Sequence, residues 1–263
     1  MPATRPPAVA GQFYSDRPDT LRRQIQEYVE TGASRVRAPA PKAVIAPHAG
    51  YVYSGPVAGT AYACVRAARE RLERVVLLGP AHRVPLRGLA LPEAEAFATP
   101  LGSVPVDGTD REALLALGSV EVADGAHALE HSLEVQLPFL QWVLGEFRLV
   151  PLAVGAASPE EVAEALELLW GGPETLIVVS SDLSHYLDYE TAREVDGAAS
   201  RAIEGLQPQD ITPDQACGHV AIRGLLLVAR RYGLRATTVD LRTSGDTAGG
   251  RDQVVGYGAY VFS

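Results

Sequence analysis

Three hydrophobic segments of the sequence each end in a residue that can bind a metal ion or transfer a proton. His48 follows the segment VIAP, His82 follows VVLLGPA, and Asp182 follows LIVVSS, with His185 three residues beyond Asp182. If these segments are parallel strands of one sheet, their carboxyl ends meet at one edge, where α/β proteins bind ligands. A single histidine after a strand more often caps a loop. The threefold repetition instead predicts one crevice lined by all four residues.

A metal ion suits such a crevice, because neutral imidazole is the commonest protein metal ligand. Two histidines with an anionic third ligand would leave coordination positions open for water, oxygen or substrate. The residues offer two candidates for the third ligand, Asp182 and Cys217, and slightly favour Asp182, which stands directly at a strand end. A carboxylate would favour Fe(II), whereas a thiolate would admit iron, Cu(I) or zinc.

Cys217 lies in the segment QACGHVAI at the predicted start of a helix. A helix N-terminus would lower the pKa of its thiol and stabilise the thiolate. Cysteine is also often a small buried hydrophobic residue, so a role in the core stays open for Cys217. Cys64, in the apolar segment GTAYACVRAA, is predicted to belong to the core. Both are expected to be thiols, because a disulfide is unnecessary in a reducing cytosol.

A further histidine, His131, lies in the segment LEHSLEVQLPFL, with Glu130 beside it and Glu134 three residues on. On a helix, His131 and Glu134 would share one face, where they could position substrate or support metal ligands. A solvated polar face explains the same spacing equally well. His127 and His219 are expected in a loop or at a helix start, and no role is assigned to them.

Several functional classes lack their signatures. The glycine-rich segments contain neither G-x-x-x-x-G-K-[ST] nor G-x-G-x-x-G, so no nucleotide cofactor is implied, and no G-x-S-x-G elbow supports a serine hydrolase. Ser180 and Ser181 are therefore expected to form hydrogen bonds at a strand end. The net charge of −9, without a basic stripe, argues against nucleic acid as a partner.

The composition favours a cytoplasmic protein that does not engage a membrane. No apolar run approaches the roughly 20 residues of a membrane-spanning helix, and the start MPATRPPAVAGQFY lacks the apolar region of a secretory signal. The chain contains no asparagine and one methionine, and this depletion of thermolabile residues suggests a thermophilic source.

Short apolar runs alternate with helical patterns, which predicts an α/β fold in a single domain spanning residues 1–263. The central strands, each apolar enough to be buried on both faces, are predicted at Ala43–Ala46, Arg74–Leu78, Phe147–Val154 and Thr175–Ser180. Two further strands are predicted at 235–241 and 253–262, and a hairpin-like excursion at 97–106.

Capping patterns predict where the helices begin and end. A helix over 19–31 is expected to end at Gly32, followed by a linker over 33–41. Ser54, Ser158 and Thr212 are expected to start helices, Ser158 through a capping box.

In combination, a set of motifs that spans nearly the whole chain resembles the Memo family. The motifs occur in the order AGQFY, APHAGYVYSG, LLGPAH, EHSLEVQLPFL, VVSSDLSHY, ACG and VVGYGAY. The resemblance implies a fold like that of the class III extradiol dioxygenases. That fold is a three-layer sandwich with a central, mostly parallel sheet and helices on both faces.

The resemblance also assigns the site residues. It implies metal ligands at His48, His82 and Cys217, which replaces the slight preference for Asp182. His185 would take the place of the dioxygenases' acid/base histidine, with Asp182 and His131 lining the same pocket as catalytic residues. The family carries a cysteine where those dioxygenases use a carboxylate. Arg83 stands where some members have a second histidine, so that position is not counted as a ligand.

The function expected from this resemblance is that of a non-heme metal protein with redox or dioxygenase-like activity on a small organic substrate. The metal is expected to be Fe2+, with copper or zinc as alternatives. A radical SAM protein and an AMMECR-type protein of the AmmeMemoRadiSam system are the expected partners. Two alternatives stay open: a zinc-dependent hydrolase that uses His185 as acid/base, and a non-catalytic module that binds a peptide or a metal.

Overall fold

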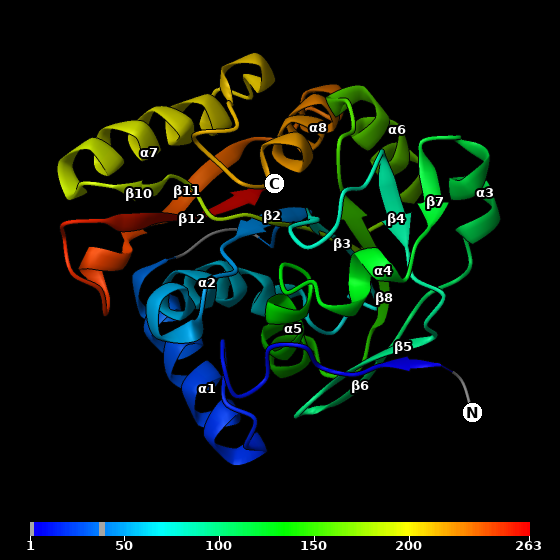
Figure 1. Cartoon of the computed structure of the whole chain (residues 1–263), viewed down its shortest axis with the longest axis horizontal. Helices are drawn as coiled ribbons and strands as arrows, with labels where there is room; N and C mark the ends of the chain where they lie inside the picture. Colours follow the sequence, from blue (N-terminus) through cyan, green and yellow to red (C-terminus); the bar gives the residue numbers. More distant parts are fainter. Residues whose placement is uncertain (1–2, 37–39) are drawn as a thin grey trace.

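The computed structural model describes residues 3–36 and 40–263, and within them a nine-stranded mixed sheet forms the centre of the molecule (Figure 1). Its order is β10-β12-β2-β9-β3-β8-β4-β7, with β11 paired to β12. The four central strands are parallel: β2 (Ala43–Ala46), β9 (Thr175–Ser180), β3 (Arg74–Pro80) and β8 (Arg148–Val154). Their carboxyl ends therefore lie at one edge, as the sequence predicts.

The flanks of the sheet are largely antiparallel. On one side β12 (Val254–Phe262) runs antiparallel to β2, and β10 (His185–Leu187) and β11 (Ala236–Thr243) pair with β12. On the other, β4 (Leu89–Leu91) is antiparallel to β8 and parallel to β7 (Val120–Val122). A small second sheet contains β1 (Thr4–Arg5), β5 (Ala96–Thr99) and β6 (Gly102–Pro105), the last two forming the predicted hairpin.

Helices cover both faces of the large sheet, which confirms the predicted three-layer α/β architecture (Figure 1). One layer contains α1 (Pro18–Arg35), α2 (Tyr51–Val65) and α5 (Leu137–Leu144), and the other contains α6 (Pro159–Leu169), α7 (Tyr189–Glu204) and α8 (His219–Arg231). Two short helices, α3 (Arg111–Ala116) and α4 (Gly125–Ala128), lie near β7. Alternate residues of β2 enter the two cores, because successive strand side chains point to opposite faces.

The four central strands and both C-terminal strands lie where the sequence predicts them, within two residues at each end. Among the described residues, no helix is both long and apolar enough to span a membrane.

Gly32 does not end the first helix, which continues to Arg35. A Cβ atom at Gly32 would lie 2.6 Å from the Cα of Thr60, so this glycine allows α1 to approach α2 closely. The predicted linker over 33–41 is thus partly helical, and its residues 37–39 lie outside the described part of the chain.

Only one of the three predicted helix starts is correct. Ser158 caps α6 through a complete capping box. By contrast, α2 begins at Tyr51, and the Ser54 hydroxyl donates to the carbonyl of Ala49 rather than capping the helix. Thr212 precedes a turn, and α8 begins only at His219. A cap followed by proline also fits a helix interior or a turn, so the pattern alone was misleading.

The N-terminal segment is held against the body of the protein by a buried carboxylate, that of Glu134. Glu134 is fully buried and forms an ion pair with Arg5. Its oxygens also accept from the backbone N–H groups of Ala8 (2.7 Å) and Val9 (3.0 Å) and from the Tyr14 hydroxyl (2.5 Å). The other nitrogens of Arg5 donate to the carbonyls of His127 (2.9 Å) and Glu130 (2.5 Å). This network fixes both the N-terminal segment and residues 127–134.

Glu134→Gln should lower the free energy of unfolding by about 3–5 kcal/mol, because it leaves the Arg5 charge buried without its partner. Urea denaturation at pH 7 measures the change. The matched control is Glu167→Gln, which breaks the exposed ion pair with Arg231 and should cost less than about 1 kcal/mol. Equal costs for the two variants would show that the buried ion pair does not hold this segment.

Candidate metal centre

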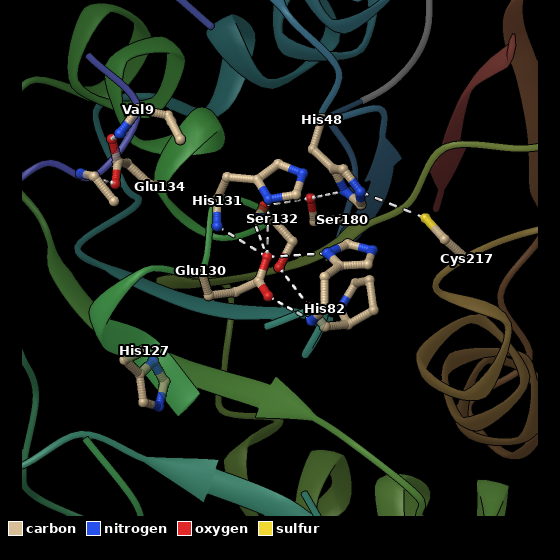
Figure 2. Close-up of polar contacts among 12 residues, drawn as sticks. Val9, His48, His82, His127, Glu130, His131, Ser132, Glu134, Ser180 and Cys217 are labelled. Atoms are coloured by element: carbon tan, nitrogen blue, oxygen red, sulfur yellow. Dashed lines mark hydrogen bonds and ion pairs between the residues drawn. The ribbon is translucent and has the colours of Figure 1, made fainter. Parts of the chain in front are cut away.

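Three histidines converge at the carboxyl edge of the parallel strands (Figure 2). His48 follows β2, His82 follows β3, and His131 comes from the segment before the short 3-10 helix η2 (Glu134–Gln136). One ring nitrogen of each lies within 4.8 Å of the others, which is close enough to share a metal ion. The sequence predicted the convergence of His48 and His82. The position of His131 beside these two histidines was expected only from the family resemblance.

Hydrogen bonds fix the tautomer of His48. The Ser180 hydroxyl donates to the carbonyl of Ser132 (2.6 Å) and accepts from the side-chain amide of Gln136 (2.8 Å). Because that hydroxyl proton is already used, the 2.9 Å contact with His48 requires Nδ1 of His48 to be the donor. Nε2 of His48 then carries the lone pair, and this atom lies 3.4 Å from Sγ of Cys217. Ser180 therefore forms the expected hydrogen bonds at the end of its strand, and one of them sets the tautomer of His48.

The carboxylate of Glu130 sets the tautomer of His82, a role that was not predicted from the sequence. Glu130 is buried, and its Oε1 lies 3.0 Å from Nδ1 of His82 while its Oε2 accepts from the His82 backbone N–H at 2.5 Å. The carboxylate also accepts from the backbone N–H groups of His131 and Ser132, each at 2.8 Å. A carboxylate that binds Nδ1–H leaves Nε2 of the ring free for a metal.

The electrostatics of Glu130 agree with this role. Burial alone would raise the pKa of Glu130, but hydrogen bonds from His82 and from the backbone of Ser132 outweigh it and lower the pKa to about 2. The carboxylate therefore stays charged across the physiological range. The only sequence signal for this role was the adjacency of Glu130 to His131.

His131 does not share a helical face with Glu134, so that expectation is wrong. It lies in the turn before η2, where its ring stacks on His82 at 4.9 Å and packs against Phe13 at 4.8 Å between ring centroids. Glu134 points the other way, towards Val9 (Figure 2). Burial and the nearby His48 lower the pKa of His131 to about 4, so its ring is neutral at pH 7.

Cys217 lies beside the histidine cluster, with its Sγ 3.4 Å from Nε2 of His48 (Figure 2). The prediction that a helix N-terminus lowers its pKa is wrong for the metal-free protein. Burial, and then the nearby carboxylate of Asp182, raise the pKa of Cys217 to about 12. Cys217 precedes the first residue of α8 by two positions, and its side chain is partly buried. Cys64 is buried in α2, as predicted.

Asp182 is buried at the end of β9, but its carboxylate is engaged by backbone. Its Oδ1 accepts from the N–H groups of His48 (2.7 Å) and Ala49 (3.3 Å), so it holds the loop that carries His48. Burial raises its pKa. Among the described residues, the group of ligand atoms within 4.8 Å of one another comprises the three histidines and includes neither Asp182 nor Cys217.

His185 lies in β10 at the exposed rim of the same region. Burial is the main cause of the lowered pKa of His48, and the nearby His185 adds to it; His185 also opposes the burial that raises the pKa of Asp182. Tyr186, next to it, is 71% exposed and adopts a left-handed backbone conformation with φ of 59°. Such a conformation is costly for a residue with a bulky side chain.

His127 lies away from the cluster and has a structural role (Figure 2). It is buried in α4, and its Nε2–H donates to the carbonyl of Ala90 in β4 at 2.9 Å. Burial lowers its pKa to about 4.

Comparisons with known proteins find members of a single family and one solved structure of similar fold. Residues 5–261 match the model of a family described as Memo-like protein. A MEMO1 family protein of Ignicoccus hospitalis is 38% identical over 285 residues, covering 98% of each chain. Another of Archaeoglobus fulgidus is 37% identical over 273 residues, covering 98% of this chain and 99% of that protein. A solved structure, an uncharacterized protein of Escherichia coli K12, is similar in fold alone: its TM-score is 0.54 at 14% identity, covering 82% of this chain and 98% of that one.

Glu130→Gln should weaken Zn2+ binding about 10- to 100-fold, because the neutral amide no longer orients His82 or raises its basicity. Competition with a chromophoric chelator measures the affinity. The matched control is Asp107→Asn, another buried carboxylate, which pairs with Arg74 at the opposite edge of the sheet. The control should lose stability but keep its affinity for zinc. Unchanged zinc affinity in Glu130→Gln would refute this role.

The metal-free protein should lose stability as the pH falls from about 6.5 to 4. His127 has a pKa of about 4 when folded, against an ordinary value of 6.5 for histidine, so only the unfolded chain gains a proton in this interval and unfolding is favoured. The effect of this residue is on the order of 3 kcal/mol at pH 4. Urea denaturation at several pH values measures it, and His127→Gln should reduce the slope by about one proton. An identical slope in the variant would contradict the assignment.

Proposed function

The chain belongs to the Memo family, and from this membership and its histidine cluster we propose that it is a non-heme metal protein whose Fe2+ is held by His48, His82 and Cys217. The observation that carries the proposal is that hydrogen bonds at Nδ1 set the tautomers of the two imidazoles. Each has its Nδ1 engaged, by Ser180 and by Glu130, so each presents an Nε2 lone pair. A donor set of two imidazoles and a sulfur suits iron, and also copper or zinc.

Cys217 is favoured over Asp182 as the third ligand for two reasons. Its Sγ is already 3.4 Å from Nε2 of His48, whereas Asp182 is engaged by the backbone of residues 48 and 49. The high pKa of Cys217 belongs to the metal-free protein. A bound divalent cation would displace the thiol proton, so metal binding and proton release are coupled.

The remaining polar residues would act on the substrate. His131 is neutral and lies within the cluster, where it could accept or donate a hydrogen bond. His185, at the exposed rim, would exchange a proton between substrate and solvent. Asp182 would keep the His48 loop in place and offset positive charge near the ring of His185. These roles correspond to acid/base and positioning steps.

The reaction we propose is a dioxygenase-like or other redox conversion of a small organic substrate. The metal would supply Lewis acidity and electron transfer when bound. We further propose that the protein is cytoplasmic and acts with a radical SAM protein and an AMMECR-type protein. A zinc-dependent hydrolase is the second candidate, because imidazole and thiolate donors are also those of catalytic zinc sites.

Metal analysis of the protein purified without oxygen tests the proposal, with about one iron expected per chain. His48→Ala, His82→Ala and Cys217→Ser should each lose stoichiometric iron while keeping the fold, since the sheet has its own core. Cys64→Ser and Asp182→Asn should retain the metal. If Asp182→Asn empties the site and Cys217→Ser leaves it full, the carboxylate is the third ligand. Stoichiometric zinc would favour the hydrolase, and a loaded site without turnover would favour a binding module.

A further inference from the structure

A cavity of about 540 Å³ opens directly beside the cluster. It lies beyond the carboxyl ends of β3 and β8, between the loop after His82 and the start of α8. His82 and Cys217 form part of its wall, so a molecule in the cavity would touch two of the proposed metal ligands. The volume falls within the range of small-molecule sites.

Most of the cavity wall is apolar. The apolar side chains are those of Pro80, Ala81, Val84, Pro85, Leu86, Val154, Ala156, Val220 and Ala221. Such a wall favours a ligand with an apolar body, because desolvating its carbon surface is favourable.

The charge of the wall is unusual for this protein. The chain carries a net charge of −9, yet Arg87 lines the cavity and no Asp or Glu does so among the described residues. Arg74 and Arg242 are neutralised by ion pairs with aspartates. Within residues 3–36 and 40–263, Arg87 forms no ion pair with a carboxylate, although this exposed residue also borders a neighbouring hollow lined by Glu121 and Glu161. Its guanidinium is therefore available to an anionic ligand.

His219 supplies a second polar group to the cavity, although the sequence assigned it no role. Its Nδ1 donates to the carbonyl of Ala216 at 3.2 Å, which leaves Nε2 as an acceptor. A hydroxyl or an N–H group of a ligand could bind there.

We propose that this cavity is the substrate pocket, and that the substrate is a small, mainly apolar carboxylic acid whose carboxylate pairs with Arg87. A guanidinium matches the planar, singly charged carboxylate by two parallel hydrogen bonds. One arginine is a poor match for a phosphate dianion, which would need more donors. The identity of the substrate rests on the proposed function, but the binding preference of the cavity does not require the metal.

The test uses benzoate, benzamide and benzamidine, three probes of nearly the same shape with charges of −1, 0 and +1, and phenyl phosphate as a fourth. Binding to the metal-free full chain is measured by protein-observed NMR. Benzoate should bind about tenfold more tightly than benzamide, and benzamidine more weakly still. Arg87→Gln should abolish this preference.

Two further variants make the test specific. Arg83→Gln removes the same charge from an exposed position of the same loop that does not line the cavity, and it should keep the preference for benzoate. Val84→Trp fills part of the cavity and should weaken benzoate and benzamide together. Equal binding of the charged and neutral probes, or an unchanged preference in Arg87→Gln, would overturn the proposal.

Failure of the proposed pocket and failure of the proposed metal site give different results. If benzoate binds only after metal loading, and equally well to the Arg87→Gln variant, the proposed pocket is refuted. The proposed metal site is then unaffected. A charge preference in the metal-free protein, combined with failure to load iron, would refute the metal assignment alone. Tighter binding of phenyl phosphate than of benzoate would show that the ligand class is a phosphate ester and would also overturn the carboxylate assignment.

Discussion

The buried ion pair between Arg5 and Glu134 holds the segment that carries His131 and Glu130 of the candidate site. Arg5 binds the carbonyls of His127 and Glu130 as well as the Glu134 carboxylate, so one guanidinium fixes both ends of residues 127–134. Leaving either charge alone in this dry environment would be costly, which makes the arrangement nearly all-or-none. The N-terminal segment thereby becomes part of the site, with Phe13 packed on His131.

The two buried carboxylates of residues 127–134, Glu130 and Glu134, bind different parts of the protein. The buried carboxylate of Glu134 binds the N-terminal segment, while that of Glu130 faces the cluster and binds His82 together with the turn that carries His131. Both are buried, and both are satisfied by several donors. Buried polar groups of this kind are tolerated only when their hydrogen bonds are complete. Arg5 donates to the backbone carbonyl of Glu130, and the carboxylate of Glu130 binds Nδ1 of His82, so this one residue connects the N-terminal segment to the ring of His82.

Burial also sets the protonation state of the site. It lowers the pKa values of His48 and His131 to about 3 and about 4, so that their lone pairs remain available at neutral pH. The same burial raises the pKa of Cys217. Under the proposed function, the neutral imidazoles would bind a metal ion directly, and the bound cation would displace the thiol proton of Cys217. The adjoining cavity, with Arg87 as its cation, extends the site towards an anionic ligand.

The sequence by itself determined the α/β fold, the central strands and the edge at which His48 and His82 meet, because continuous apolar runs bury on both faces and parallel strands end together. Its helix limits failed at Gly32, where close packing of α1 against α2 decides the geometry, and at Ser54 and Thr212, where the cap-and-proline pattern lies in a helix interior and before a turn. Only the tertiary structure placed Glu130 on His82, Ser180 on His48 and Cys217 beside a histidine 169 residues away in sequence. These contacts depend on which way a side chain points from an irregular turn, and neither apolar periodicity nor residue type encodes that direction.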